Sequence, residues 1–359
     1  MRSGNLSFIR AESIRLPGLN GKTRETSSPG GLCRKVGACG QQPAELRALH
    51  SSLMGVRVRL PIELGGGPFS VSHAQSLGVG SSRLRGPDLH SPFWGVRVPA
   101  GSVKTLLDRV IAYEKRMSPA AFFSHLTAAM LWSIPLPFAL EQRSSLDLAV
   151  IPGQVVPVGA GIRGHRLQVD ERDVLRFGRI RVTSLARTWC DLGALRSEED
   201  LLAAGDFLLW RRRPDDLRLS KTDLADALGR WKGRRGRPNL ERCLPTLNDR
   251  ADSPPESRIR VRFALAGLPT PEVNCEICTD AGVFVAMADL GWRKYRVHFD
   301  YEGDGHRTDR VQWGKDLKRA PRIENANPSY VRAGAPDLQN SREIIEILKS
   351  RPRRGGWRG

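Results

Sequence analysis

The feature that most constrains the fold is the stretch of residues 283–306, which reads VFVAMADLGWRKYRVHFDYEGDGH. An apolar run ends at Asp289, and a short polar turn follows it. Apolar and polar residues then alternate strictly over Val297–Glu302, which is the period of a half-buried strand. Two strand-like runs joined by a short turn predict a β-hairpin.

The hairpin would gather acidic side chains on one face, because Asp300 and Glu302 alternate with apolar neighbours. If the turn is centred near residues 293–294, Asp289 lies opposite His298 and diagonal to Asp300, about 7–8 Å away. Carboxylates at that spacing can share a hard divalent cation. A solvated strand face carries the same residue types, so the pattern alone leaves both interpretations open.

The stretch also resembles the core of the very-short-patch-repair endonuclease-like domains of the PD-(D/E)XK nuclease superfamily. Their usual pattern is an Asp, then a strand that ends in Glu-x-Asp-Gly-x-x-His, with a helical Glu upstream. Here Asp289 precedes the run DYEGDGH of residues 300–306, and Glu256 stands in the upstream position. The resemblance covers about residues 250–350, and it departs from the pattern where Asp300 replaces the strand Glu and Glu302 the following Asp.

This resemblance implies a restriction-endonuclease-like α/β core and metal-dependent hydrolysis of phosphodiester bonds. Asp289, Asp300 and Glu256 would be the metal-binding residues, with Mg²⁺ or Mn²⁺ as the cofactor. In the superfamily a Lys usually stands where this chain has Glu302, so His306 is the candidate for acid/base chemistry or phosphate contact. The predicted catalytic set is these five residues.

Glu256 has a competing interpretation as part of a helix start. Ser253 and Glu256 have the spacing of a capping box, and the two prolines between them suit a first helical turn. The sequence leaves the catalytic and the capping roles of Glu256 both open.

Residues 69–99 predict a small DNA-binding module. A helical stretch reaches Leu77, Gly78 breaks it, and a second short helix is expected to begin near Ser81. Helices joined at a glycine turn are typical of the helix-turn-helix, and the following residues 93–98 read as a strand, which gives a winged arrangement. A small helical hairpin with a β arm is the alternative.

The second of these helices would be the recognition helix, with Ser82, Arg83 and Arg85 near its start, where side chains reach the major groove. The block is similar to the N-terminal winged-helix domain of AbiEi-type antitoxins. That similarity implies a winged helix over residues 54–102 and leaves a toxin or operon partner open.

The middle of the chain, residues 103–248, predicts a mixed connecting domain that gives no chemistry by itself. Ser184, Arg187, Thr188 and Asp191 are expected to be capping and helix-to-core residues, with a polar site as the alternative. A glycine-broken basic cluster contributes Arg234, Arg235 and Arg237, which either contact phosphates or form a solvated linker loop.

Charge and composition favour an anionic partner. The formal net charge of the 359-residue chain is +19, which points to nucleic acid first, and to DNA in the light of the resemblances. Residues 1–53 are rich in Gly, Ser, Arg and Pro and predict a disordered tail. No secretory pattern or membrane span is expected, so the predicted location is cytoplasmic.

The six cysteines do not predict a zinc site. Cys275 and Cys278 have the spacing of half a zinc motif with no second pair nearby, and on a strand they would face opposite sides.

The sequence therefore predicts a multi-domain α+β or α/β protein with an endonuclease-like domain over residues 249–359. The predicted function is DNA binding with metal-dependent cleavage. The alternative is an antitoxin-like transcriptional regulator whose nuclease fold is catalytically inactive.

Overall fold

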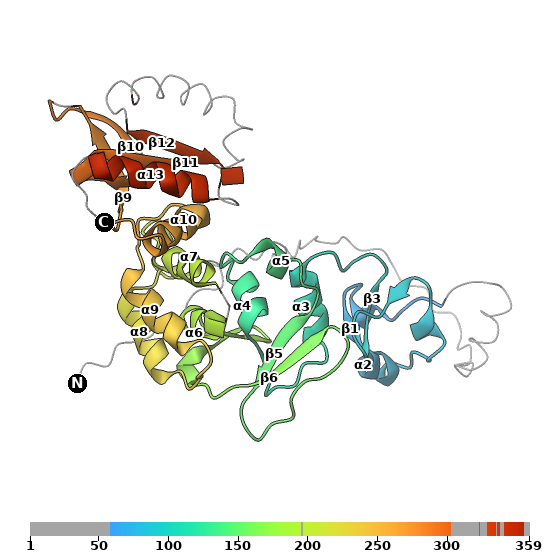
Figure 1. Cartoon of the computed structure of the whole chain (residues 1–359). Coiled ribbons are helices and arrows are strands. Elements are labelled where there is room, and N and C mark those ends of the chain that lie inside the picture. Colours follow the sequence, from blue (N-terminus) through green and yellow to red (C-terminus); the bar gives the residue numbers. More distant parts are fainter. Residues whose placement is uncertain are drawn as a thin grey trace, which may run out of the picture. The chain divides into compact units, whose positions relative to one another are not determined.

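The computed structural model describes residues 58–194, 197–279, 281–302, 323, 329–334, 336–337 and 341–354, with the backbone alone for 352–354. The predicted tail and His306 lie outside these residues. The chain divides into two compact units, Met1–Met117 and Ser118–Gly359. The described residues form a mixed α+β protein with three sheets (Figure 1). The sequence-based divisions at residues 53, 102 and 248 stay predictions.

The first unit contains a three-stranded sheet of order β1-β3-β2, in which both pairs are antiparallel. Its core is an apolar cluster that includes Phe69, Ala74 and Leu84. Tyr113 packs its ring edge against Phe93 at 5.1 Å, so α3 belongs to this unit. The elements are η1 (Ile62–Leu64), β1 (Phe69–Ser70), α2 (Val71–Ser76), η2 (Arg83–Arg85), β2 (Leu89–His90), β3 (Val96–Pro99) and α3 (Leu106–Glu114).

The predicted recognition helix is not an α-helix. Ser70 caps α2 by accepting from the His73 amide, and Gly78 turns the chain with a φ of 81°. The next element, η2, is a single 3₁₀ turn. Gly86 and Pro87 follow it directly, and a residue before proline disfavours helical backbone, so the chain has no room for a longer helix there.

The second unit begins with a five-stranded sheet of order β6-β5-β4-β8-β7. β5 is buried along its whole length, and Trp189 on α6 is fully buried, with its indole donating to the Leu201 carbonyl of α7 at 3.0 Å. The elements are β4 (Phe122–Phe123), α4 (His125–Leu131), α5 (Phe138–Glu141), β5 (Leu146–Val150), β6 (Ile162–Arg166), η3 (Glu171–Asp173), β7 (Val174–Phe177), β8 (Ile180–Thr183), α6 (Leu185–Asp191), η4 (Leu192–Ala194), α7 (Glu198–Leu209), α8 (Lys221–Arg230) and α9 (Arg237–Thr246).

A four-stranded sheet of order β12-β11-β10-β9 ends the second unit. β9, β10 and β11 pair antiparallel, and β12 pairs parallel with β11. Apolar residues of α10 and α13 join one core cluster with Leu290, Phe299 and Val331 of the sheet. The elements are α10 (Pro254–Leu265), β9 (Glu272–Cys278), β10 (Phe284–Trp292), η5 (Arg293–Tyr295), β11 (Val297–Glu302), β12 (Tyr330–Gly334) and α13 (Arg342–Arg354).

The residues of β10 on the two sides of Asp289 belong to different apolar clusters. Leu290 belongs to the cluster under α10, whereas Ala288 belongs to a second cluster with Ile277 and Tyr330. Alternate residues of a regular strand lie on the same face of the sheet, so the strand departs from regular geometry between Ala288 and Leu290. Asn274, which the register places across from Asp289 on β9, has a φ of 53°, a conformation that Asn tolerates.

Ion pairs fasten α10 to α7, and Figure 1 shows α10 between α7 and the C-terminal sheet. Arg258 pairs with Asp200 at 2.8 Å, and Arg262 pairs with Glu199 at 2.9 Å. Between them the buried Arg260 pairs with the buried Asp206 at 2.6 Å. We call these three pairs the arginine ladder. The first helix of the predicted nuclease domain is thus held by the preceding part of the unit.

None of the helices in the described part of the chain combines the length and the apolarity of a membrane span.

Candidate functional site

Two carboxylates replace part of the hydrogen-bond ladder between β10 and β11. The Asp289 amide donates to Oδ1 of Asp300 at 2.8 Å, and the Tyr301 amide donates to Oδ2 of Asp289 at 2.7 Å. Each carboxylate therefore bonds the backbone of the opposite strand. Both side chains are half-buried, which leaves them within reach of solvent. We call this arrangement the acidic junction.

The predicted register of the hairpin is wrong by two residues. Gly291, and not Asp289, lies opposite His298, and Leu290 lies opposite Phe299. The reason is the turn: η5 is a 3₁₀ turn closed by Arg296 in the left-handed conformation with a φ of 53°, so its centre falls one residue later than expected. Asp289 consequently lies across from Asp300 instead of diagonal to it.

Tyr330 is a site residue that the sequence reasoning missed. Its hydroxyl donates to Oδ2 of Asp300 at 2.5 Å from the neighbouring parallel strand β12. Burial, followed by the charge of Asp300, raises the pKa of Tyr330, so the hydroxyl stays protonated and remains a donor. No local sequence signal places β12 beside β11, because β12 is not part of the hairpin that β10 and β11 form.

Glu256 lies at the start of α10, and its carboxylate accepts from the two residues that precede the helix. Its Oε1 accepts from the Ser253 hydroxyl at 2.6 Å and its Oε2 from the Asp252 amide at 3.0 Å. Burial raises the pKa of Glu256, hydrogen bonds from Ser253 and Asp252 oppose the shift, and the charges of Asp252 and Asp300 add to it. Ser253 is the N-cap of α10 and accepts from the Glu256 amide at 3.4 Å, as the capping-box spacing predicted, but the Glu256 carboxylate bonds the amide of Asp252 and not that of Ser253. Asp300 is close enough to act on Glu256 electrostatically.

The donor set fits a divalent cation held by two carboxylates. Mg²⁺ commonly binds through one or two carboxylates, with waters and substrate phosphates completing the octahedron. A carboxylate offers about four lone-pair sites, so the protein donors do not exhaust Asp289 and Asp300. Within the part of the chain that the structure describes, no three His, Cys, Asp or Glu side chains are grouped to hold a metal. Glu256 is therefore not gathered with the two aspartates there.

We predict a pH signature for Glu256. A folded-state pKa raised above the ordinary value of 4.5 adds stability below about pH 4.5 and loses it as the pH rises through the folded-state pKa. Glu256→Gln stays neutral, so we expect it to gain stability relative to wild type between about pH 4.5 and pH 7. Urea unfolding at both pH values measures this gain, with Glu346→Gln on α13 as the exposed control. A difference that does not change with pH would contradict the prediction.

The two remaining members of the predicted catalytic set are Glu302 and His306. Glu302 is exposed and pairs with Arg332 of β12 at 3.0 Å. The Arg332 guanidinium lies 5.5 Å from the centre of the Tyr330 ring. His306 lies outside the described residues, so its role stays a prediction.

The residues predicted to contact DNA divide into internal and exposed ones. Arg83 donates to both oxygens of Asp88, at 3.0 and 2.7 Å, and to the Val58 carbonyl. Arg237 donates to the carbonyls of Leu228 and Trp231. These two arginines are held by partners within the fold, and the predicted major-groove contact of Arg83 and phosphate contact of Arg237 stay predictions. The exposed members are Ser82, Arg85, Arg234 and Arg235.

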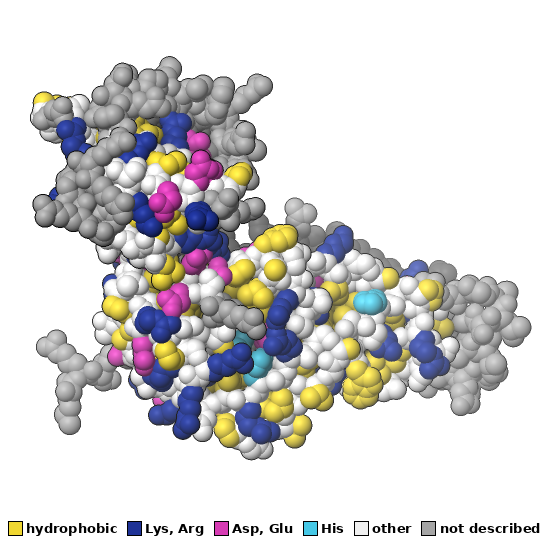
Figure 2. Space-filling view, in the orientation of Figure 1, with side chains coloured by type: hydrophobic (Ala, Val, Ile, Leu, Met, Phe, Trp, Pro, Cys, Tyr) yellow, Lys and Arg dark blue, Asp and Glu magenta, His cyan; other side chains and the backbone are white. Residues whose placement is uncertain are grey.

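Basic side chains are widely distributed. Figure 2 shows Lys and Arg side chains spread over the described part of the visible face, with acidic side chains among them. Nucleic-acid-binding proteins commonly gather their Lys and Arg side chains on one face or along one stripe, and this view shows them mixed with acidic side chains.

Arg83 and Arg85 are expected to respond differently to replacement. Arg83→Ala should lower the melting temperature, because it removes a two-bonded ion pair with Asp88. Arg85→Ala should leave melting unchanged and reduce the slope of log affinity for duplex DNA against log salt by about 0.9. Circular-dichroism melting and anisotropy titrations at several salt concentrations measure the two effects. A reversed pattern would show that η2 is not presented to DNA.

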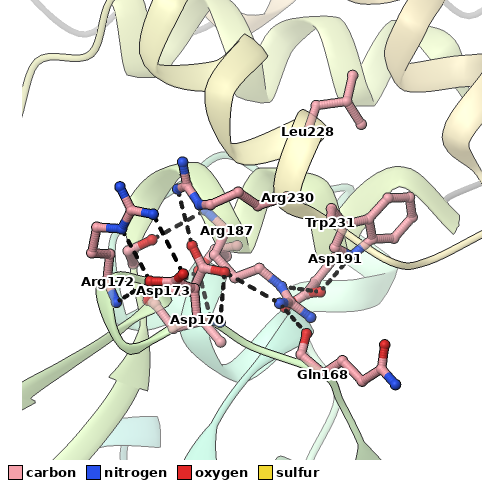
Figure 3. A network of polar contacts seen from close by, with 12 residues as sticks. Gln168, Asp170, Arg172, Asp173, Arg187, Asp191, Leu228, Arg230 and Trp231 are labelled. Atoms are coloured by element: carbon pink, nitrogen blue, oxygen red, sulfur yellow. Dashed lines mark hydrogen bonds and ion pairs between the residues drawn. The ribbon is translucent and has the colours of Figure 1, made fainter.

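A buried polar network in the middle of the chain holds α6 in place (Figure 3). Arg187 donates to Asp191 at 2.9 Å and to the Gln168 carbonyl at 2.8 Å, and it lies 3.6 Å from Asp173. The Trp231 indole donates to the same Asp191 oxygen at 3.2 Å. Four segments of the chain thus meet at two charged side chains, and the expected helix-to-core role of Arg187 and Asp191 is confirmed.

The other expectations for this helix are also confirmed. Ser184 caps α6 by accepting from the Arg187 amide at 3.2 Å, and Thr188 shares a hydrogen bond with Thr183 at 2.8 Å. These side chains serve local structure.

A histidine pair borders this network. The His125 ring stacks on His165 at 3.9 Å between centroids, and His165 Nε2 lies 2.8 Å from Asp147 Oδ1. Burial lowers the pKa of His125, opposed by the charge of Asp191. The His165 contact went unnoticed in the sequence because β6 is mostly exposed and gives little periodic signal.

Comparisons with known proteins add relatives but no activity. No family model and no solved structure matches the chain. Two proteins from two strains of Mycobacterium tuberculosis are each 26% identical to it over 225 residues, covering 61% of this chain and 78% of the relative. Both are described as uncharacterized proteins. The indications of function therefore come from the residues of the acidic junction.

Proposed function

We propose that the protein binds DNA and hydrolyses its phosphodiester bonds at the acidic junction. The observation that supports this is the reciprocal bonding of Asp289 and Asp300 to the opposite strand, which brings two half-buried carboxylates together across a sheet. Such carboxylates are hard oxygen ligands suited to Mg²⁺ or Mn²⁺. A DNA substrate implies action in the cytoplasm.

The cation would be held by Asp289 and Asp300, where it supplies Lewis acidity toward a phosphate and lowers the pKa of an attacking water. The residues of the chain supply the positioning. The amides of Asp289 and Tyr301 fix the two carboxylates, and the Tyr330 hydroxyl holds the second oxygen of Asp300. Side chains locked by such supporting bonds keep a site in its productive geometry.

The test is cleavage of supercoiled plasmid and of single-stranded DNA by the full chain with Mg²⁺ or Mn²⁺. We expect cleavage that EDTA stops, together with cation binding in calorimetry. Absence of both would overturn the proposal.

The second candidate is a DNA-binding regulator with an inactive nuclease fold. It is favoured by the observation that protein donors already bond Asp289, Asp300 and Glu256. DNA binding by a preparation that neither binds the cation nor cleaves would support this candidate.

A further inference from the structure

Trp94 is an exposed aromatic residue on a well-fixed loop between β2 and β3. The residue is 84% exposed, whereas its neighbour Phe93 is 4% exposed. The Ser91 hydroxyl accepts a hydrogen bond from Arg97 at 2.9 Å. Its single proton is shared between the carbonyls of Phe93 and Val96, at 3.1 and 3.2 Å. The Val71 amide donates to the Gly95 carbonyl at 2.8 Å. Trp94 therefore projects from a loop whose backbone is held on both sides.

Arg116 completes the feature. Its guanidinium donates to the Trp94 carbonyl at 2.8 Å and lies 5.2 Å from the centre of the indole ring. The same guanidinium lies 5.8 Å from the ring of the buried Tyr113. Arg116 is itself exposed, so the loop presents an indole ring and a cation side by side.

The surroundings favour a planar, anionic partner over an apolar protein surface. Among the described residues of the first unit, the large hydrophobic residues exposed to solvent are Val58, Ile62 and Trp94, and no other member of the Trp94 loop is among them. A protein-docking patch would need contiguous apolar area, which a single ring does not provide. The described residues of this unit also carry more Lys and Arg than Asp and Glu.

An aromatic ring beside an arginine matches the chemistry of an unpaired nucleotide. Every nucleobase has a π face, and stacking on an aromatic side chain contributes about 1–3 kcal/mol per base. In an intact duplex the base faces are covered by their neighbours, so an unpaired base is the form that can stack. The guanidinium can contact the attached phosphate.

We propose that Trp94 stacks on an unpaired base of single-stranded DNA and that Arg116 contacts the adjoining phosphate. This rests on the proposed binding of DNA and goes beyond it by naming the form of DNA that Trp94 contacts.

Fluorescence anisotropy with the full-length protein tests the proposal, using one labelled oligonucleotide as a single strand and as a blunt duplex. Trp94→Ala should weaken single-strand affinity about ten-fold, which corresponds to about 1.4 kcal/mol. Duplex affinity should change by less than about two-fold, and Trp94→Phe should restore most of the single-strand affinity, because phenylalanine also stacks. Phe138→Ala, at a residue 75% exposed on α5, is the matched control and should have no effect.

Salt dependence separates the two residues. Trp94→Ala should leave the slope of log affinity against log salt unchanged, because the indole is neutral. Arg116→Ala should reduce that slope by about 0.7 for a single strand. Circular-dichroism melting confirms that each variant is folded.

The outcomes separate the proposed binding of DNA from the stacking contact of Trp94. If wild type binds neither form of DNA, the proposed function and this inference both fail. If wild type binds and Trp94→Ala matches it on the single strand, or loses both forms equally, the stacking contact alone is overturned.

Discussion

Asp289→Asn is expected to lower cation-dependent cleavage by roughly 1,000-fold, since a bound cation contributes several kcal/mol to such reactions. The substitution keeps an oxygen that can accept the Tyr301 amide, so the junction between β10 and β11 should survive. It removes one of two adjacent negative charges, so thermal stability should hold or rise slightly. Plasmid-nicking rates and cation calorimetry on the same preparation measure the loss.

The matched control is Glu276→Gln, which neutralises an exposed carboxylate on the neighbouring strand β9. It should cleave at the wild-type rate. If the Asn variant still bound the cation and cut DNA as wild type does, Asp289 would have no place in the site and the acidic junction would be a structural device.

Asp206→Asn is expected to cause a large loss of stability, because Asp206 is the buried acceptor of the arginine ladder. Asp206 accepts from the Arg260 guanidinium at 2.6 Å, the Ser257 hydroxyl at 2.7 Å and the Asn248 amide at 2.7 Å. Removing the charge leaves the buried guanidinium of Arg260 without its counter-ion, which costs up to about 3–5 kcal/mol. Burial raises the pKa of Asp206 despite Arg260, so relief of this buried charge offsets part of the loss. Urea unfolding with a constant m-value measures this free energy.

Asp200→Asn is the control for that experiment, because it breaks the more exposed pair with Arg258 in the same ladder. A surface pair contributes about 0–1 kcal/mol, so the effect should be several-fold smaller. Replacing Asp206 and Arg260 together by Leu and Met should recover only part of the loss: no unpaired charge remains, but the Ser257 hydroxyl and the Asn248 amide lose their acceptor. Equal effects of the two single substitutions would contradict the assignment of Asp206 as the buried anchor.

The sequence predicted the hairpin well and its register poorly. Strict alternation over β11 is a local property, so it identified the strand and the buried Val297 and Phe299, but His298, which it placed on the polar face, is only 5% exposed. The register of a hairpin depends on the number of residues in its turn. Arg296 takes the left-handed conformation that usually marks a glycine, so nothing in the sequence indicated that the turn extends to this residue. The direct opposition of Asp289 and Asp300 therefore needed the structure.

Contacts between distant segments were not predictable from local pattern. Tyr330 reaches Asp300 because β12 lies parallel to β11, a sheet order that no spacing in the chain encodes. The internal partners of Arg83 and Arg237 were missed for the same reason. Composition marks an arginine as basic, whereas its internal carbonyl and carboxylate partners appear only in the fold.

The arginine ladder also determines where this chain can be cut to make a chimeric protein. A fragment cut at residue 249 would begin with a helix whose three arginines had lost Asp200, Asp206 and Glu199, and would leave Asp206 without Arg260 in the parent. The smallest cassette that can be transplanted with its charges matched therefore starts at α7. A homologue that exchanges its terminal sheet must inherit α7 with it, or change both sides of the ladder together.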